Sequence, residues 1–450
     1  MSASARRPSV SMVGLGYVGL TTAACLSSRG VRVLGIDVDE SRVKRIMDGE
    51  PVLKEAGLGP LIRKGLRSRT LKIQSDFAGV DESDIIFLTV GTPSRHDGSI
   101  DTTYVEDAAK RVGEALRLAE GFHTLVVKST VVPGTTRGRV KPILESTSKK
   151  KVGDAIGLGV NPEFLFEGSA VRDTMSPEAL VLGTMDHRTE NSLLGLYRGF
   201  YRRLPPLIRT TPENAELMKY AINSFRAVQV GYVNFLANIC SKVDGGEMDD
   251  VTRGLKVVAR MDQRYLGAGL GYGGSCLPKD SRALNAFAKS IDVEPMILDS
   301  TIRMNEVQPG EALRMAERLA GDLRGKRVAV LGLAFKQGTD DVRESTAIRV
   351  VQNLLKAGAD VVVFDPAAME NARAVLGRRV QYADTPEMCI SGADVCVVAT
   401  GWDSFRKLRP GTFKTLMRTP SVVDGRRIFD PSLFRARGVR LLRVGTAPPG

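Results

Sequence analysis

Residues 10–19 most constrain what this chain can fold into. A short apolar run, Val-Ser-Met-Val, leads into Gly14-Leu-Gly16-Tyr-Val-Gly19, and a small-residue pattern typical of a helix follows. In this spacing Gly14 makes a tight turn, Gly16 lets a pyrophosphate reach the helix N-terminus, and Gly19 lets the helix pack closely on the strand. The segment predicts a dinucleotide-binding β-α-β unit, with cofactor contacts from Gly14, Gly16, Tyr17, Val18 and Gly19.

A second apolar run ends on Asp37, eighteen residues after Gly19. An acid at this position accepts hydrogen bonds from the adenosine ribose hydroxyls and repels a 2′-phosphate. We therefore expect the cofactor to be NAD rather than NADP.

The apolar pattern divides the rest of the chain into sections. Up to residue 212, strands and helices alternate as in a parallel sheet, with strands expected at 10–14, 33–37, 85–90, 124–129 and 157–160. An uninterrupted helical pattern covers residues 213–239. From residue 325 the alternation restarts, with one strand running into Gly332 and the next ending on Asp365. This echoes the N-terminal unit but lacks its three spaced glycines, which makes it a poor NAD site.

The run Gly273-Gly274-Ser275-Cys276-Leu277-Pro278-Lys279-Asp280 places one cysteine in a glycine-rich turn, close to a cation and a carboxylate. A cysteine in a loop can be an inert thiol, or a nucleophile if nearby positive charge favours the thiolate. Oxidation of an aldehyde benefits from a thiol, because the thiohemiacetal can lose hydride and the resulting thioester can be hydrolysed. A nicotinamide cofactor together with Cys276 therefore favours oxidation to the level of an acid.

These motifs resemble the UDP-glucose/GDP-mannose dehydrogenase family over residues 9–430. The resemblance implies an α/β fold of two doubly wound Rossmann-like domains joined by a long central helix. Its domains would be residues 1–212 for NAD, 213–315 for dimerisation and 316–450 for the UDP-sugar. It further implies NAD-dependent four-electron oxidation of UDP-glucose at C6 to UDP-glucuronate, a step of polysaccharide biosynthesis, in a homodimer or higher homo-oligomer.

The resemblance also assigns roles in the first section. The expected cofactor contacts include Asp37, Arg42, Thr92, Pro93, Thr130 and Glu167. Thr130 would position a water, Glu163 would take part in the first oxidation, and Phe164 and Leu165 would contact substrate. Phe166 stands where relatives carry arginine or a small residue.

Lys219 and Asn223 lie four positions apart in the helical pattern, and therefore on one helix face. They form either an exposed polar pair or, as the resemblance implies, donors that stabilise an oxyanion in the substrate cleft. Asp280 joins them and Cys276 among the expected catalytic residues. Gln229 and Phe235 depart from the family further along this helix.

Further substrate contacts are implied in the second half of the chain: Arg260, Tyr265, Leu266, Gly273, Phe335, Lys336 and Arg426. An ungapped alignment places Arg260 on the family's sugar-contacting arginine, whereas Arg264 requires a four-residue deletion. Arg343 would contact the cofactor, although Asp341, Arg343 and Glu344 could equally form a structural set of ion pairs. The arginine fork of Arg426 suits diphosphate oxygens.

Composition limits the alternatives. The net charge is +13, but the basic residues are spread along the chain, which disfavours nucleic-acid binding. No apolar stretch approaches a membrane span, and the three histidines form no cluster, so we expect neither a membrane partner nor a metal. Five scattered cysteines fit a reducing, cytoplasmic setting.

Two other functions remain open. The segment from Leu277 to Leu284 is somewhat similar to GDP-mannose dehydrogenases, which makes GDP-mannose an alternative substrate. A two-electron hydroxyacid reductase would share the N-terminal fold, but it would need neither Cys276 nor the C-terminal section.

Overall fold

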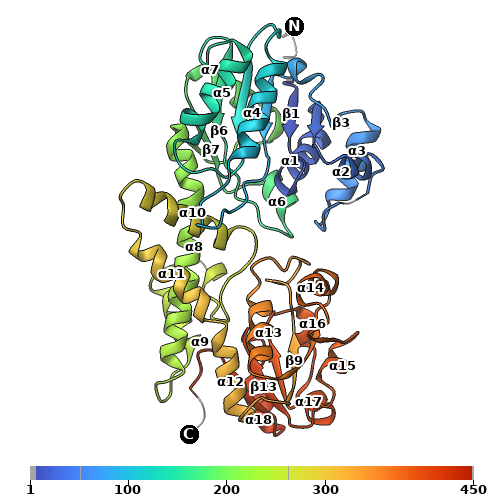
Figure 1. The fold of residues 1–450 in the computed structure, drawn as a ribbon, viewed down its shortest axis with the longest axis vertical. Coiled ribbons are helices and arrows are strands. Elements are labelled where there is room, and N and C mark those ends of the chain that lie inside the picture. Colours follow the sequence, from blue (N-terminus) through green and yellow to red (C-terminus); the bar gives the residue numbers. More distant parts are fainter. Residues whose placement is uncertain (1–6, 51, 262, 448–450) are drawn as a thin grey trace. The chain divides into compact units, whose positions relative to one another are not determined.

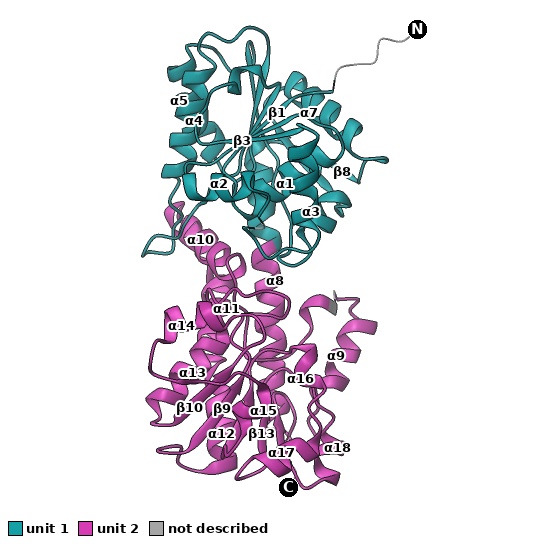
Figure 2. Cartoon of the chain, turned by 90° about the vertical axis from the view of Figure 1, so that its right-hand side faces the viewer, with its two compact units in different colours: residues 1–222 teal, residues 223–450 magenta. Residues whose placement is uncertain are grey.

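The computed structural model describes residues 7–50, 52–261 and 263–447. They form two compact units, residues up to 222 and residues from 223 onwards (Figure 2). The division falls inside one long helix, α8 (Pro212–Cys240). The three-domain division expected from the sequence stays a prediction.

Unit 1 is coloured from blue to green in Figure 1. It is built on an eight-stranded sheet with the order β3-β2-β1-β4-β5-β6-β7-β8. The strands are β1 (Val10–Val13), β2 (Val33–Ile36), β3 (Leu71–Gln74), β4 (Ile85–Leu88), β5 (His123–Val127), β6 (Ile156–Val160), β7 (Leu180–Thr184) and β8 (Leu207–Thr210). Neighbouring strands are parallel, as the alternating pattern predicts, except that β6 and β7 pair antiparallel.

The helical segments of unit 1 are α1 (Tyr17–Ser28), α2 (Glu40–Met47), α3 (Leu58–Arg67), η1 (Val80–Glu82), α4 (Thr103–Ala115), η2 (Thr136–Val140), α5 (Lys141–Ser148), α6 (Ala170–Met175) and α7 (His187–Phe200). Apolar side chains from β1, α1, α3 and α7 share one core. This core holds the first strand and helix rigid behind the glycine turn between them.

Unit 2 contains a six-stranded, all-parallel sheet with the order β11-β10-β9-β12-β13-β14. Its strands are β9 (Arg327–Leu331), β10 (Asp360–Phe364), β11 (Gln381–Tyr382), β12 (Val395–Val398), β13 (Ser421–Asp424) and β14 (Arg440–Arg443). Its helical segments are α9 (Met248–Val257), η3 (Gln263–Tyr265), α10 (Leu277–Ser290), α11 (Met296–Val307), α12 (Gly310–Ala320), α13 (Thr346–Lys356), α14 (Met369–Leu376), α15 (Pro386–Ile390), α16 (Asp403–Arg406), α17 (Pro410–Leu416) and α18 (Pro431–Ala436).

The two sheets begin in the same way. The second strand of each is followed by a buried aspartate, Asp37 or Asp365, whose carboxylate accepts a 2.7 Å hydrogen bond from the backbone of Leu15 or Leu333. In each unit this bond ties the first strand's turn to the end of the second strand. The fold thus consists of two Rossmann-like α/β units joined by a long helix, as predicted.

Candidate active site

The glycine turn after β1 leaves room for a ligand backbone. Gly14 has a φ of 95°, and a β-carbon there would lie 2.9 Å from the backbone of Thr89. At Gly19 a β-carbon would lie 1.9 Å from the Gly14 carbonyl oxygen, so only glycine lets α1 approach this closely. At Gly16, by contrast, the same position is open, at the N-cap of α1. The turn therefore fits a dinucleotide pyrophosphate at the helix N-terminus.

Asp37 lies beside this turn. Its carboxylate also accepts hydrogen bonds from Arg42 Nη1 and from the Asp39 backbone N–H, both at 3.0 Å. The structure thus brings together Asp37 and Arg42, two of the expected cofactor contacts.

Tyr17, the first residue of α1, contacts Glu55, a residue that the sequence analysis did not identify. Its hydroxyl donates a hydrogen bond to the buried Glu55, and the Gly168 N–H lies 2.9 Å from the Tyr17 oxygen and 2.8 Å from Glu55 Oε2. Burial and the neighbouring Glu55 raise the pKa of Tyr17 well above its usual value. Glu55 follows an irregular stretch without a motif, so no sequence signal pointed to it. This contact joins the start of α1 to the loop that carries Glu163 and Glu167.

The loops after β4 and β5 lie together, as expected for neighbouring parallel strands. Ser129 Oγ donates a 2.7 Å hydrogen bond to the Val90 carbonyl. Thr92 is buried, Pro93 accepts a 2.8 Å bond from the Asp101 N–H, and Thr130 is half-buried. These expected cofactor contacts therefore border one edge of the sheet.

Lys219 and Glu163 form a buried ion pair. Lys219 Nζ lies 2.7 Å from both Glu163 Oε1 and the Glu163 carbonyl oxygen, and the two side chains are only 5% and 9% exposed. Burial alone would raise the pKa of Glu163, but Lys219 and the Leu165 N–H outweigh it, so the pKa lies below its usual value. Phe164 covers the pair, with its ring centre 5.6 Å from Lys219 Nζ. The sequence left two interpretations of Lys219, and the one that makes it an exposed polar residue is wrong.

Lys128 is a second buried cation that the sequence interpretation left out of the site. Its ammonium donates hydrogen bonds to Asn161 Oδ1 at 2.9 Å and to the Asn161 carbonyl at 3.2 Å. Burial lowers the pKa of Lys128 to about 8, although Glu163 acts in the opposite direction. The sequence signal was a lysine directly after the apolar strand β5. Two lysines thus face the acid-bearing segment that follows β6.

The rest of that segment is also held in place. Phe166 donates its backbone N–H to Asp173 at 3.1 Å, and Glu167 is half-buried beside it. Phe166 therefore occupies its unusual position without displacing the neighbouring acids.

In unit 2, Asn223 and Asp280 meet directly. Asn223 Nδ2 donates a 2.6 Å hydrogen bond to Asp280 Oδ2, and Lys279 Nζ donates a bond of the same length to Oδ1. The Asp280 side chain is 1% exposed. The structure therefore brings two expected catalytic residues together and adds Lys279 to them.

Cys276 lies at the N-cap of α10 and is exposed. The positive end of a helix stabilises a thiolate and exposure gives a substrate access to it. The other cysteines are buried free thiols, and burial raises the pKa of Cys25 and of Cys389 to about 12. Cys276 is thus the cysteine placed to react.

The glycines before Cys276 are required by packing. A β-carbon on Gly273 would lie 2.4 Å from the Glu344 carbonyl, and one on Gly274, where φ is 85°, would lie 2.7 Å from the Phe335 ring. Phe335 and the backbone around Arg343 therefore pack directly against the turn that carries Cys276.

The acidic and basic residues after Phe335 are paired. Arg343 Nη2 lies 2.7 Å from Asp341 Oδ2, whereas Glu344 binds Arg282 and Arg349. The structure contains the ion pairs that were one of the two interpretations of Asp341, Arg343 and Glu344. A cofactor role for Arg343 stays a prediction. Lys336 Nζ lies 5.6 Å from the centre of the Phe335 ring.

Arg426 is a half-buried cation surrounded by neutral acceptors. It donates hydrogen bonds to the Ala399 carbonyl at 2.7 Å, to Thr346 Oγ1 at 3.0 Å and to the Gly271 carbonyl at 3.3 Å. No carboxylate of a described residue pairs with it, and burial lowers its pKa to about 10. A half-buried guanidinium without a carboxylate partner among the described residues is suited to an anionic ligand group.

The two candidate sugar-contacting arginines are both exposed. Arg260 has a φ of 52° in the loop after α9, and Arg264 lies in η3. In the same stretch Leu266 is buried, and the Tyr265 ring centre lies 5.3 Å from the Arg226 guanidinium. The choice between Arg260 and Arg264 stays open.

Among the described residues, no cluster of three or more histidine, cysteine or acidic side chains could hold a metal ion. Within those same ranges, none of the helices combines the length and apolarity needed to cross a bilayer.

Known proteins share this architecture along nearly the whole chain. The UDP-glucose 6-dehydrogenase AglM of Haloferax volcanii is 43% identical, over 93% of this chain and 96% of its own length. A GDP-mannose 6-dehydrogenase of Pseudomonas putida is 38% identical, over 89% and 92%. The structure of a UDP-glucose dehydrogenase from Pyrobaculum islandicum superimposes with a TM-score of 0.91 at 38% identity, over 99% of this chain and 100% of the other.

Sequence models of one family match in three consecutive segments. They are its NAD binding domain at residues 8–201, its central domain at 213–307 and its UDP binding domain at 329–431. The chain belongs to the UDP-glucose/GDP-mannose dehydrogenase family and is an NAD-dependent dehydrogenase.

Proposed function

We propose that this enzyme oxidises C6 of UDP-glucose from the alcohol to the carboxylate, reducing two NAD molecules for each sugar. The observation that carries the proposal is the exposed Cys276 at the N-terminus of α10, in a chain with an NAD-binding domain. An alcohol dehydrogenase that stopped at the aldehyde would need no such thiol.

In the first oxidation, the C6 alcohol loses a proton to a base and a hydride to NAD, which supplies the hydride acceptor. Two buried clusters are candidates for holding the alcohol oxygen and its proton: Lys219 with Glu163, and Asn223 with Asp280. The ammonium and the amide can donate to an oxyanion, whereas the carboxylates can accept the proton.

In the second oxidation, the Cys276 sulfur adds to the aldehyde carbon, and the carbonyl oxygen becomes the hydroxyl of a thiohemiacetal. Loss of a second hydride to NAD and of the hydroxyl proton gives a thioester. A water then attacks the thioester carbon, which releases the carboxylate and restores the thiol. Thr130 is the residue we assign to position that water.

For substrate binding, we propose that Arg426 contacts the diphosphate, because its half-buried guanidinium has only neutral partners among the described residues. Phe335, Lys336 and Gly273 would border the sugar end, with Tyr265, Leu266 and either Arg260 or Arg264. The UDP binding domain supports a UDP-sugar. The similarity to a GDP-mannose 6-dehydrogenase keeps GDP-mannose as the second candidate.

The test is the NADH formed per sugar consumed, across a panel of UDP- and GDP-sugars. We expect two NADH per UDP-glucose and little free aldehyde. A ratio of one would contradict the four-electron reaction, and turnover with GDP-mannose alone would select the other substrate.

Replacing the nucleophile is a second test. Cys276→Ser should retain NAD and UDP-glucose binding but lose nearly all turnover, because a serine hydroxyl is far less acidic and its ester hydrolyses poorly. Cys240→Ser, the same substitution at a buried thiol at the end of α8, is the matched control. If Cys276→Ser kept more than about a tenth of the rate, a barrier change below roughly 1.4 kcal/mol, the assignment would fail.

Two further expectations concern the cellular location and the oligomeric state. The five free thiols fit a reducing, cytoplasmic location. A homodimer stays a prediction, for which the exposed apolar side chains of α8 are the main support.

A further inference from the structure

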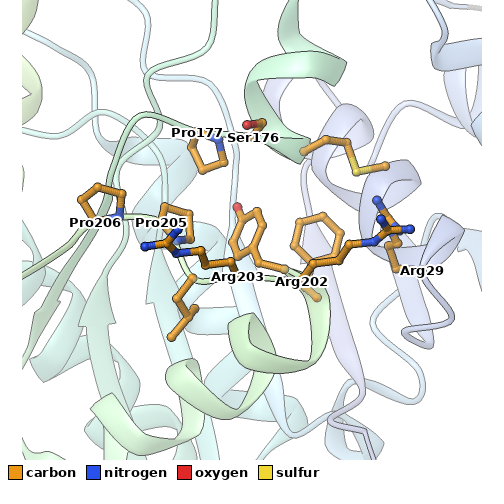
Figure 3. Close-up of a pocket in the computed structure, with 11 residues that line it drawn as sticks. Arg29, Ser176, Pro177, Arg202, Arg203, Pro205 and Pro206 are labelled. Atoms are coloured by element: carbon orange, nitrogen blue, oxygen red, sulfur yellow. The ribbon is translucent and has the colours of Figure 1, made fainter.

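A cavity of about 640 Å³ lies in unit 1 at the C-terminal end of α1, whereas the cofactor turn lies at the N-terminal end (Figure 3). Three segments line it: Arg29 after α1, Met175 to Pro177 at the end of α6, and the stretch 200–206 after α7. None of the residues proposed above for the reaction lines this cavity.

The cavity carries a concentrated positive charge. Arg29, Arg202 and Arg203 line it without any acidic residue, and none of them forms an ion pair with a described carboxylate. The side chain of Arg202 extends toward Arg29 in this view, and both line the same cavity (Figure 3). Like charges in one cavity repel each other, and a bound anion relieves that repulsion.

Two further cations lie around the end of α1. Arg7 donates a hydrogen bond to the Arg29 carbonyl, and Lys64 Nζ donates one of 3.2 Å to the Ser28 carbonyl. Both side chains neutralise the negative end of the helix dipole. The guanidinium of Arg29 therefore remains directed to the cavity rather than being used as a helix cap.

The other walls are rigid and partly aromatic. The rings of Phe200 and Tyr201 pack edge to face at 4.7 Å, and the Tyr201 hydroxyl is held by the Thr174 carbonyl at 3.1 Å. Pro177, Pro205 and Pro206 complete the rim. Because prolines and a fixed tyrosine lose little freedom when a ligand binds, these walls are preorganised.

We propose that this cavity binds a small phosphorylated anion of nucleotide size, at a site separate from those for NAD and the UDP-sugar. Its volume lies within the range of about 300–1,000 Å³ typical of small-molecule sites. Planar arginine forks match phosphate oxygens, and the aromatic wall offers a surface for a flat ring. Residues 202–206, which supply two of the arginines, lie between the segments that match the family's NAD binding and central domains.

The site is placed to influence the cofactor. Arg29 directly follows α1, whose first turn carries the dinucleotide fingerprint, and Met175 ends α6, which follows the loop of Glu163 and Glu167. The two helices also pack against each other. A ligand that orders this end of α1 and α6 should therefore change the KM for NAD.

The experiment is isothermal titration calorimetry on the full-length enzyme saturated with NADH and UDP-glucose, a combination that cannot turn over. Inorganic pyrophosphate and ADP are the two probes. The test variant is Arg202→Glu/Arg203→Glu, and the matched control is Lys110→Glu/Arg117→Glu, an equal charge change at exposed positions on and just after α4. All of these side chains are exposed, and thermal melting checks that both variants fold.

We expect one site per chain, at least tenfold weaker binding in the test variant and unchanged binding in the control. Equal binding of the two probes would assign the affinity to the phosphates, whereas tighter ADP binding would add the aromatic wall. No binding to wild type, or equal losses in both variants, would leave only a solvated basic surface and overturn the proposal. Because the two variants are compared with each other, this result does not depend on UDP-glucose being the substrate.

The coupling is tested separately by steady-state kinetics. Pyrophosphate should change the KM for NAD at least threefold in wild type and in the control, but not in Arg202→Glu/Arg203→Glu. An unchanged KM in wild type, at concentrations that saturate the calorimetric site, would contradict the link to the cofactor.

Discussion

Lys128 is buried, and its surroundings disfavour its charge. Its pKa of about 8 in the folded chain lies below the usual value of 10.5. Between these two values the unfolded chain keeps the proton on Lys128 and the folded chain does not, so the contribution of Lys128 to stability rises with pH across this window. Below pH 8 both states are charged, and the cost of burying the charge is present in full.

We therefore predict that Lys128→Met, which removes the charge, abolishes this pH dependence. From pH 7 to pH 10 the wild type should gain up to about 3 kcal/mol relative to the variant. Thermal unfolding of both proteins at several pH values measures the change. Lys110→Met, at an exposed lysine, should instead melt in parallel with wild type. Parallel curves for Lys128→Met as well would contradict the low pKa.

The residues of the candidate site were predictable from sequence to the extent that they stand in spaced motifs. Gly14, Gly19 and Cys276 belong to such motifs, and the geometry explains each of them. Lys128 and Glu55 were missed because the local sequence does not indicate that a charged side chain will be buried. The burial of such a side chain depends on segments far away in the chain, such as the loop around Gly168.

At the scale of the element, the contact of α1 with β1 depends on a single missing side chain. Gly19→Ala should weaken NAD binding at least tenfold and lower the Tm, because the new β-carbon would overlap the Gly14 carbonyl, a backbone atom that cannot move aside alone. Gly195→Ala, at an exposed and uncrowded position of α7, should instead stabilise by about 0.5–1 kcal/mol. NAD titration and thermal melting of both variants give the answer; wild-type affinity in Gly19→Ala would refute the role of close packing.

The elements themselves were predicted unevenly. The five strands expected in the first section all exist within a few residues of their expected bounds, and the helix expected over 213–239 is α8. Buried parallel strands read as continuous apolar runs, which is why β1, β4 and β5 stand out. β3 and β8 are as long as β1, but half of their residues are polar, so their apolar pattern is weak. The antiparallel direction of β7 depends on tertiary packing, which the periodicity of a strand does not indicate.

At the scale of the whole molecule, α8 exposes an apolar stripe along its second half. Phe225, Tyr232, Phe235 and Ile239 are between 43% and 62% exposed, at helical spacings of seven, three and four residues. Met218 and Ile222, earlier on the same helix, are half-buried. The flanking parts of the same chain therefore leave the four residues of the stripe uncovered. A stripe of this kind in a single chain usually marks an interface.

We predict that this stripe pairs with the same stripe of a second copy, in an isologous dimer. Light scattering in dilute solution should give twice the chain mass of 48.7 kDa. Tyr232→Glu/Phe235→Glu places two charges in the predicted interface, and should give a monomer with reduced activity if the partner supplies Arg260 to the substrate. Tyr104→Glu/Leu118→Glu, at exposed apolar positions on and just after α4, is the control and should remain dimeric. A wild-type monomer with full activity would show that one chain builds the whole site, and would exclude donation of Arg260 between subunits.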